Sequence, residues 1–333
     1  MTDCFDVTIE DHVAHISLCR PDVFNTMVPE FWNDLPRIVR DIDDHAKARV
    51  IVLSSTGKHF CAGMDLAVFA GEGLTEGGVQ EQGRKRAHLW MLVQKLQDSF
   101  TAFEQARMPV LAAVQGGCIG GAVDMVTAAD LRYCTEDAFF CVQEINLGMT
   151  ADVGTLQRLP KLIPEGIARE YAYTGARMPA SEALQYGLVN RVFPDHASLL
   201  EGVMGVARQI ATRSPLAIWG TKEMVNFTRD HSVADSLATW RAGSPACSSP
   251  ATWWRRWSPR ASVVTRRSRS SRPGRPAWAG SPGPAAQTWP RPRSVAACRR
   301  ASRSPWSAPA SHSALTLHSL RWASWPVICT FSR

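Results

Sequence analysis

The chain has 333 residues, of which 45% are apolar, as is typical of a soluble globular protein with a sizeable core. Its nine cysteines form no Cys-x-x-Cys pair and its nine histidines have no His-x-His or His-x3-His spacing, so neither a disulfide framework nor a metal site is predicted. The formal charge of +7 does not indicate a nucleic-acid partner, because residues 241–333 hold sixteen Arg and no Lys, Asp or Glu, which leaves residues 1–240 with a net charge of −9.

Residues 1–240 carry the alternating and helical periods of a folded domain. Four stretches have strand character, at residues 12–18, 50–55, 110–114 and 131–142. Seven stretches have helical patterning, at residues 29–45, 88–106, 122–130, 153–163, 165–175, 181–187 and 198–212. A polar, glycine-rich loop is expected at residues 71–87. Strands that alternate with helices predict an α/β class in which helices cover the sheets.

Targeting signals are not apparent in the sequence. The segment MTDCFDVTIEDH is acidic and has no apolar run of the kind that a signal peptide needs. No apolar run reaches membrane-spanning length, and the last residues, FSR, are not a peroxisomal address. We therefore expect a cytoplasmic protein without a membrane partner, from a bacterium with a GC-rich genome.

From about Arg241 the sequence becomes rich in Arg, Ser, Pro and Trp and loses any helical or strand period, which predicts an irregular tail. Eight of the chain's twelve Trp lie beyond residue 240. A disordered basic arm that binds nucleic acid is one interpretation. Such arms usually mix Lys with Arg and seldom contain this much Trp.

A shifted reading frame in a GC-rich gene is the interpretation that we favour for residues 241–333. Read one base out of frame, Trp253-Trp254 encodes valine without ambiguity. With GC-rich codons, the run from Ala246 to Trp257 then reads LLISRDLVEAV, which has the amphipathic period of a helix. On this interpretation the tail has no selected function, and an uninterrupted frame encoding it in close relatives would contradict the idea.

Two glycine motifs can place backbone amides at one point. In GKHFCAGMDLAVF (57–69), Ala62-Gly63 allows a tight turn that directs the amide of Met64 into a cavity. In QGGCIGGAVDM (115–125), glycines follow a strand and open a helix, where backbone N–H groups are free. Two such amides from separate loops form an oxyanion hole for a carbonyl that gains negative charge. Close helix packing explains the second motif alone equally well.

Three acids lie among apolar neighbours: Asp124, Glu144 and Asp152. No Lys or Arg occurs from Tyr133 to Gln157, so Glu144 and Asp152 lack a local counter-ion. Carboxyls confined in an apolar pocket have raised and separated pKa values, which suits a general acid and a general base. Helix capping or buried hydrogen bonding is the alternative for each acid, and Asp152 is a plausible N-cap.

Taken together, these motifs and acids resemble the enoyl-CoA hydratase/isomerase (crotonase) superfamily over residues 5–240. Within it, the glycines of QGGCIGG, the RYCTEDAFF block, the E-x7-D spacing and ADVGTLQRLPK are most similar to the Δ3,5-Δ2,4-dienoyl-CoA isomerases. The resemblance implies a crotonase-like ββα spiral core in residues 1–240 with its C-terminal helical part truncated. It also implies an acyl-CoA thioester substrate and no separate cofactor.

Site residues follow from the same resemblance. The amides of Met64 and Gly121 would form the oxyanion hole, Glu144 and Asp124 fall on the two acids of the hydratases, and Asp152 falls on the acid that marks the dienoyl-CoA isomerases. We expect Glu144 and Asp152 to exchange protons with the two ends of the diene, while Asp124 tunes them. The resemblance also places five residues at the substrate: Ala62, Gly63, Asp65, Gly120 and Asn25, the last being equally interpretable as a turn residue.

The leading functional prediction is isomerisation of 3,5-dienoyl-CoA to 2,4-dienoyl-CoA in fatty-acid β-oxidation. The alternatives are an enoyl-CoA hydratase that uses Glu144 and Asp124, and an inactive product of a damaged gene. The family builds trimers, usually stacked as hexamers, through C-terminal helices that here end near Trp240 after a small deletion before residues 238–240. A homo-oligomer is therefore expected only if those helices were intact. Lys222 could meet a CoA phosphate, but an exposed helix lysine is the favoured interpretation.

Overall fold

The computed structural model describes residues 3–65 and 81–241, and their main element is a six-stranded sheet with the strand order β1-β2-β3-β4-β6-β9. Only β1 and β2 pair antiparallel; every other neighbouring pair is parallel. Every residue of β3 and β4 is buried, as expected for parallel strands covered on both faces. The strands span Phe5–Glu10 (β1), Val13–Leu18 (β2), Val50–Ser55 (β3), Val110–Val114 (β4), Leu131–Thr135 (β6) and Arg191–Phe193 (β9).

A smaller sheet lies beside the first and gives the fold its repeat. It contains β5 (Gly117–Ile119), β7 (Phe139–Cys141) and β8 (Arg177–Pro179). The chain passes from β4 through β5 into α4 (Gly121–Thr127), and then from β6 through β7 towards α5 (Thr155–Leu162). Each passage is a strand of the large sheet, a short strand of the small sheet and a helix. The predicted α/β class with a ββα repeat and helices covering the sheets is confirmed.

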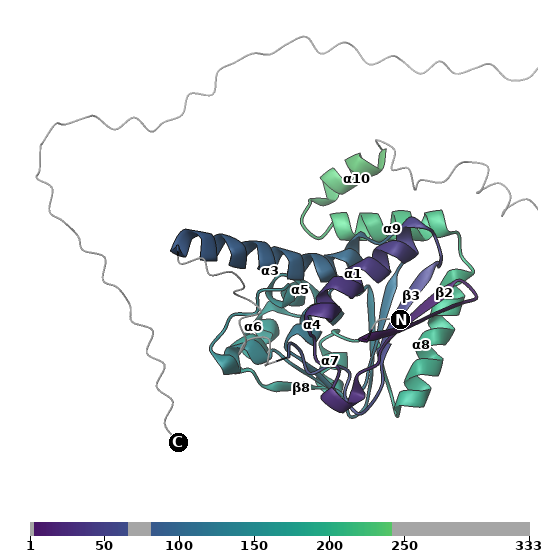
Figure 1. The fold of residues 1–333 in the computed structure, drawn as a ribbon. Coiled ribbons are helices and arrows are strands. Elements are labelled where there is room, and N and C mark those ends of the chain that lie inside the picture. The colour runs from purple at the N-terminus through teal and green to yellow at the C-terminus, as the bar shows by residue number, and fades with distance from the viewer. Residues whose placement is uncertain (1–2, 66–80, 242–333) are drawn as a thin grey trace, which may run out of the picture. The chain divides into compact units, whose positions relative to one another are not determined.

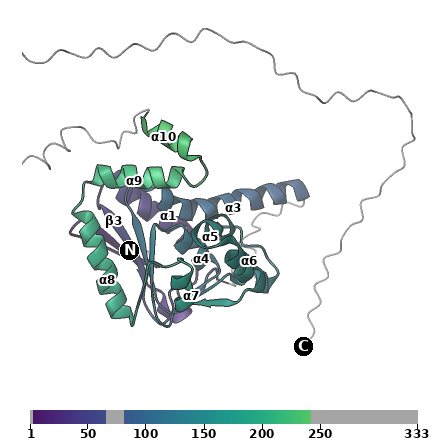
Figure 2. The ribbon, with the colours of Figure 1, turned by 180° about the vertical axis from the view of Figure 1, so that it is seen from behind.

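Helices enclose both faces of the large sheet, as Figure 1 and the reverse view in Figure 2 show. One face is covered by α8 (His196–Ala211), whose Leu199, Val203 and Ala207 are fully buried against the sheet. The other face packs against α1 (Pro29–Asp44) and α3 (Gln82–Gln105). The other helices of the described residues are α6 (Glu165–Thr174), α7 (Ala180–Gln185), α9 (Pro215–Phe227) and α10 (Val233–Arg241), with short 3-10 turns η1 (Pro21–Val23) and η3 (Gln143–Leu147).

The polar loop predicted at 71–87 differs from the structure. The prediction is wrong for its last residues, because α3 begins at Gln82, where the Glu81 carboxylate caps the amides of Gly83 and Arg84. Residues 71–80 of that predicted loop lie outside the described residues.

Lys222 is neither an exposed lysine nor a free cation, so both interpretations of it are wrong. Its side chain is buried and its ammonium donates to the carbonyls of Phe103 and Met108, at 2.6 and 2.9 Å, and pairs with Asp130 at 2.8 Å. The residue therefore fastens α9 to the end of α3 and to the segment before β6.

The predicted tail, residues 241–333, lies outside the described part of the chain apart from Arg241, the last residue of α10. Among the described helices, none is both long enough and apolar enough to cross a membrane.

Candidate active site

The two glycine motifs meet where they leave their strands. An isolated parallel bridge joins Cys61 to Cys118, so the segment after β3 runs beside β5. Gly63 has a φ of +85°, a region that favours glycine, and a Cβ on it would stand 2.7 Å from the Ile119 carbonyl oxygen and 3.3 Å from the Gly121 nitrogen. Only a glycine allows the two loops to approach this closely.

The approach leaves two backbone amides free side by side. The amide of Met27 donates to the Gly63 carbonyl at 2.8 Å and that of Asp65 donates to the Met27 carbonyl at 3.1 Å, so the pairing passes over Met64. Gly121 is the first residue of α4, where an amide has no acceptor within the helix. Within residues 3–65 and 81–241, neither amide donates to another group. These are the two amides predicted for the oxyanion hole.

Three carboxyl groups are supplied by consecutive elements around this point. Asp124 lies on α4, and its Oδ1 accepts a hydrogen bond from the amide of Thr155 at 2.6 Å. Glu144 lies on η3, where its Oε1 is 3.4 Å from the place that a Cβ on Gly120 would take. Asp152 lies in the segment that leads from η3 to α5. The structure thus gathers residues that are up to 28 positions apart in the sequence.

Burial leaves two of these carboxyls short of partners. The Oδ2 of Asp124 and the Oε2 of Glu144 are buried and have no hydrogen-bond partner in the described part of the chain. Burial, together with the negative charges of Asp124 and Asp152, raises the pKa of Glu144 to about 7. Burial likewise raises the pKa of Asp124 to about 6, although the hydrogen bond from Thr155 opposes this. Such values allow protonated and ionised forms to coexist near neutral pH.

Asp152 does not share the buried environment that we predicted for all three acids. The residue is exposed at the edge of the group, although partial desolvation still raises the pKa of its carboxyl. It nevertheless lies close enough for its charge to raise the pKa values of both Glu144 and Asp124. The three acids therefore interact, with one facing solvent and two facing the interior.

The N-cap interpretation applies to a different acid from the one expected. Helix α5 begins at Thr155, and the carboxyl that accepts its first amide belongs to Asp124 on the neighbouring helix, not to Asp152. Capping uses only Oδ1 and leaves Oδ2 without a partner. In Asp124, therefore, Oδ1 has a structural role, and Oδ2 is left without a hydrogen-bond partner among the described residues.

This arrangement has the components of enolate chemistry. Two adjacent free amides can stabilise negative charge that develops on a carbonyl oxygen, and removing one such donor typically costs about 100-fold to 1,000-fold in rate. Carboxyls with raised pKa values can take a proton and return one near neutral pH. No group of His, Cys, Asp or Glu among the described residues is suited to hold a metal ion.

Comparison with known proteins agrees with these features. The model of the enoyl-CoA hydratase/isomerase family matches residues 8–241. The chain belongs to this family. It is 44% identical over 235 residues to the mitochondrial Δ3,5-Δ2,4-dienoyl-CoA isomerase of Homo sapiens, which covers 69% of this chain and 71% of the relative. The peroxisomal Δ3,5-Δ2,4-dienoyl-CoA isomerase of Arabidopsis thaliana is 40% identical over 236 residues, which cover 70% of this chain and 85% of the relative.

A solved structure extends the comparison to the fold. The crystal structure from Thermobifida fusca YX, described as that of an enoyl-CoA hydratase in complex with acetoacetyl-CoA, matches with a TM-score of 0.65 and 27% identity. The match covers 72% of this chain and 93% of that structure. The resemblance drawn from the motifs is therefore confirmed, both for the family and for its dienoyl-CoA isomerase branch.

The remaining predicted residues of this family member are mostly engaged within the protein. The buried Asn25 amide donates to the carbonyls of Thr56, His59 and Phe60, and its Oδ1 accepts from the amide of Arg20. With a φ of +54°, Asn25 is the turn residue of the alternative interpretation, and its amide hydrogens are not free for a ligand.

Ala62, Asp65 and Gly120 frame the free amides. Ala62 donates its amide to the Phe24 carbonyl at 3.0 Å, and Gly120 donates its amide to the Cys141 carbonyl at 2.9 Å. The Asp65 carboxylate accepts from the Thr26 hydroxyl at 3.1 Å. Their roles at a substrate stay predictions, whereas their structural contacts fix the loops on which Met64 and Gly121 lie.

Two contacts of this site were missed from the sequence. The amide of Thr155 partners Asp124, and the side chain of Gln97 on α3 donates to the backbone carbonyl of Asp152 at 2.7 Å. Both partners are separated widely in sequence and belong to residue types that carry no catalytic signature. No sequence pattern could have found them without the fold.

Proposed function

We propose that this family member isomerises 3,5-dienoyl-CoA to 2,4-dienoyl-CoA. The reaction removes a proton from C2, next to the thioester carbonyl, and returns a proton at C6. The electron pair of the broken C–H bond forms the C2–C3 double bond, the existing double bonds move one position, and the C6–H bond takes up the last pair. No oxidant, reductant or further cofactor is needed, and coenzyme A enters only as part of the substrate.

In this proposal the free amides of Met64 and Gly121 hold the thioester oxygen while it carries the enolate charge. Glu144 and Asp152 exchange protons with C2 and C6, one as carboxylate and the other as carboxylic acid. Asp124 maintains the difference between them, because its negative charge raises the pKa of Glu144. The hydrogen bond from Thr155 in turn keeps Asp124 in place.

The observation that carries the proposal is the convergence of two unpartnered buried carboxyl oxygens with two free amides, next to a third acid at the solvent edge. The names of the relatives supply the reaction: they are 44% and 40% identical and are Δ3,5-Δ2,4-dienoyl-CoA isomerases. A plain hydratase needs only Glu144 and Asp124 and gives Asp152 no chemical role.

Two substrates separate the isomerase from the hydratase. The purified full-length chain is incubated with 3,5-dienoyl-CoA and, separately, with a 2-enoyl-CoA, and each conversion is followed by ultraviolet absorbance. We expect turnover of the diene that exceeds hydration of the 2-enoyl-CoA by at least tenfold. The opposite preference would replace the proposal with the hydratase, and no turnover of either substrate would support an inactive gene product.

The Asp152→Asn variant tests the residue that distinguishes the two reactions. We expect it to lose isomerisation while its dissociation constant for an acyl-CoA stays within threefold of the unmodified chain, because the amides that hold the thioester are unchanged. Comparable turnover in this variant would remove Asp152 from the mechanism.

We also propose a biological setting. We place the reaction in fatty-acid β-oxidation in a bacterial cytoplasm, although the relatives named above are mitochondrial and peroxisomal. We further propose residues 1–240 as the catalytic domain, residues 241–333 as an out-of-frame tail, and a trimer or hexamer only where the C-terminal helices are intact. Resequencing the locus tests the tail. Size-exclusion chromatography tests the assembly, for which a discrete hexamer supports function and aggregates support damage.

A further inference from the structure

The segment that carries Asp152 is bonded to residues other than the three acids of the candidate site. It runs between Gly148, with a φ of +72°, and Gly154, with a φ of +137°. Asp152 itself is exposed, and its carboxyl interacts with its own backbone amide, so the direction of the carboxyl follows that of the backbone. The direction of its carboxyl must then depend on how the backbone of this segment is tied to the rest of the fold.

One tie comes from α3. The Nε2 of Gln97 donates to the backbone carbonyl of Asp152 at 2.7 Å, a bond that joins residues 55 positions apart. Gln97 lies on a rigid part of the helix, since its own carbonyl accepts from the Thr101 hydroxyl at 2.9 Å and the adjacent Leu96 is buried in the core. The bond therefore links the exposed acid to a well-packed helix.

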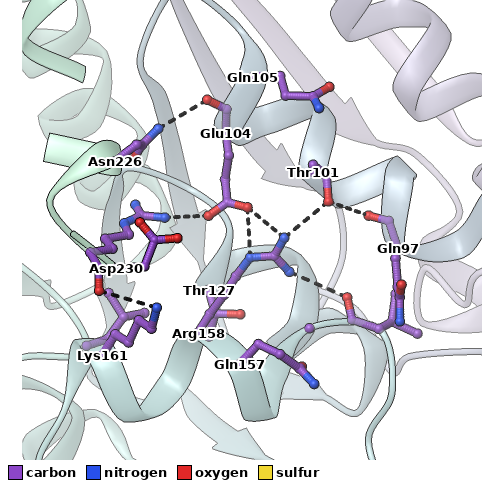
Figure 3. A pocket seen from close by; sticks show the side chains of 14 residues that line it. Gln97, Thr101, Glu104, Gln105, Thr127, Gln157, Arg158, Lys161, Asn226 and Asp230 are labelled. Carbon is purple, nitrogen blue, oxygen red and sulfur yellow. Dashed lines mark hydrogen bonds and ion pairs between the residues drawn. The ribbon is translucent and has the colours of Figure 1, made fainter. Parts of the chain in front are cut away.

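A second tie supports the end of the segment. The Arg158 guanidinium lies where a side chain on Gly154 would otherwise stand, 1.8 Å from that Cβ position, and it reaches the Val153 carbonyl at 3.5 Å. Glu104 on α3 holds Arg158 through two hydrogen bonds, of 2.7 and 3.1 Å. Figure 3 shows this pair in the wall of a cavity of about 690 Å³ that Gln97, Val153 and Gly154 also line.

This cavity is not the place of the chemistry. Its lining includes none of the three acids and neither of the two free amides, and the side chains that line it are mainly polar or charged. The cavity lies next to the Asp152 segment, and the residues that line it support that segment. Arg158 bonds to Val153 and lies beside Gly154, whereas Gln97 alone of the cavity residues bonds to Asp152.

We propose that Gln97 is a positioning residue for the reaction, setting the direction of the Asp152 carboxyl through the hydrogen bond to its backbone carbonyl. The inference rests on the proposed isomerase function. Loss of the bond frees the peptide that follows Asp152 to rotate between the two glycines, which moves the carboxyl relative to the carbon of the diene with which it exchanges a proton. A displacement of about 1 Å in a reacting group can cost on the order of 100-fold in rate.

Gln105 provides a matched control. It is on the same helix, lines the same cavity and has the same side chain, yet Figure 3 draws no hydrogen bond between that side chain and the other residues of the cavity. The comparison uses Gln97→Met, which keeps the length but removes the donor, Gln97→His, which restores a neutral N–H donor of similar reach, and Gln105→Met. Each is made in the full chain and assayed on 3,5-dienoyl-CoA, with thermal unfolding measured in parallel.

We expect Gln97→Met to lower kcat by tenfold to a hundredfold with KM within twofold, because the thioester site is untouched. Gln97→His should recover kcat to within fivefold of the unmodified chain, and Gln105→Met should stay within twofold. Equal kcat values for Gln97→Met and Gln105→Met would overturn the inference, as would Gln97→His that is no better than Gln97→Met.

A further variant guards against a loss that comes only from folding. Gln97→Glu keeps the shape but sets an ionised acceptor against the Asp152 carbonyl, so kcat should fall at least as far as in Gln97→Met while the chain stays folded at the assay temperature. A folded Gln97→Glu variant with unchanged kcat would also refute the role. If the unmodified chain does not convert 3,5-dienoyl-CoA, the proposed function fails first; if it does and the Gln97 variants match it, only this inference fails.

Discussion

Replacing Gly63 by Ala should damage the oxyanion hole without touching any carboxyl. The new Cβ would stand 2.7 Å from the Ile119 carbonyl oxygen and 3.3 Å from the Gly121 nitrogen, at a φ of +85°. Backbone atoms cannot rotate away, so the two loops must separate by roughly half an ångström or more to regain ordinary contact. We expect a loss of stability of about 1–3 kcal/mol from the strained backbone conformation. The larger effect is on the amide of Met64, the next residue.

Misplacing one donor of an oxyanion hole lowers kcat by about 100-fold to 1,000-fold, or about 2.7–4 kcal/mol of transition-state stabilisation. The assay is turnover of 3,5-dienoyl-CoA at saturating substrate, at a temperature where circular dichroism shows the variant folded. Gly166→Ala is the control, because Gly166 is an exposed residue of α6 where a Cβ meets nothing within 4 Å. Its kcat should be unchanged. A folded Gly63→Ala variant with kcat within threefold of the unmodified chain would refute the assignment of the Met64 amide.

Two further predictions concern buried charges. Because the folded-state pKa of Glu144 is raised from 4.5 to about 7, its contribution to stability is present below pH 4.5 and is lost as pH rises through about 7. The free energy of unfolding of Glu144→Gln, measured with urea, should therefore increase relative to that of the unmodified chain by up to about 3 kcal/mol between pH 4.5 and pH 8. A difference between the two chains that does not change with pH would contradict the raised pKa. Lys222→Met should lower the free energy of unfolding by about 3 kcal/mol or more, because it removes the cation that pairs with Asp130 and the donor to two carbonyls, and leaves Asp130 with the Val110 amide. A loss below about 1 kcal/mol in urea denaturation would show that the buried ion pair is dispensable.

Part of the fold could be predicted because its central strands are strongly apolar. The stretches at 50–55 and 110–114 match β3 and β4 residue for residue, since a buried parallel strand needs a continuous apolar run. The three-residue strands β5, β8 and β9 were not predicted, because three residues give no period and pairing with distant strands defines them. Helix α9 was also absent from the predicted helices, and its start at Pro215 with a Ser214 cap is visible in the sequence only in retrospect.

The candidate site likewise has features that the sequence predicted and features that only the fold reveals. The amide of Met64 followed from the Ala62-Gly63 turn, which is visible locally in the sequence, whereas the amide of Gly121 was assigned through the resemblance to the family. A buried environment was predicted for all three acids. It is confirmed for Asp124 and Glu144 but not for Asp152, which is exposed, because burial depends on how the whole chain packs. Lys222 illustrates the limit most clearly, since it was interpreted as an exposed lysine, whereas its three partners lie 92–119 positions earlier in the sequence.

The most direct test of the central claim is isomerisation of 3,5-dienoyl-CoA by the full-length chain in D₂O, with the product examined by mass spectrometry and NMR. Two separate carboxyls, one of them exposed to solvent, should deliver a solvent deuteron to C6 of the 2,4-dienoyl-CoA product. A product that has gained water, or an isomerised product without deuterium at C6, would contradict proton exchange by Glu144 and Asp152 at opposite ends of the diene.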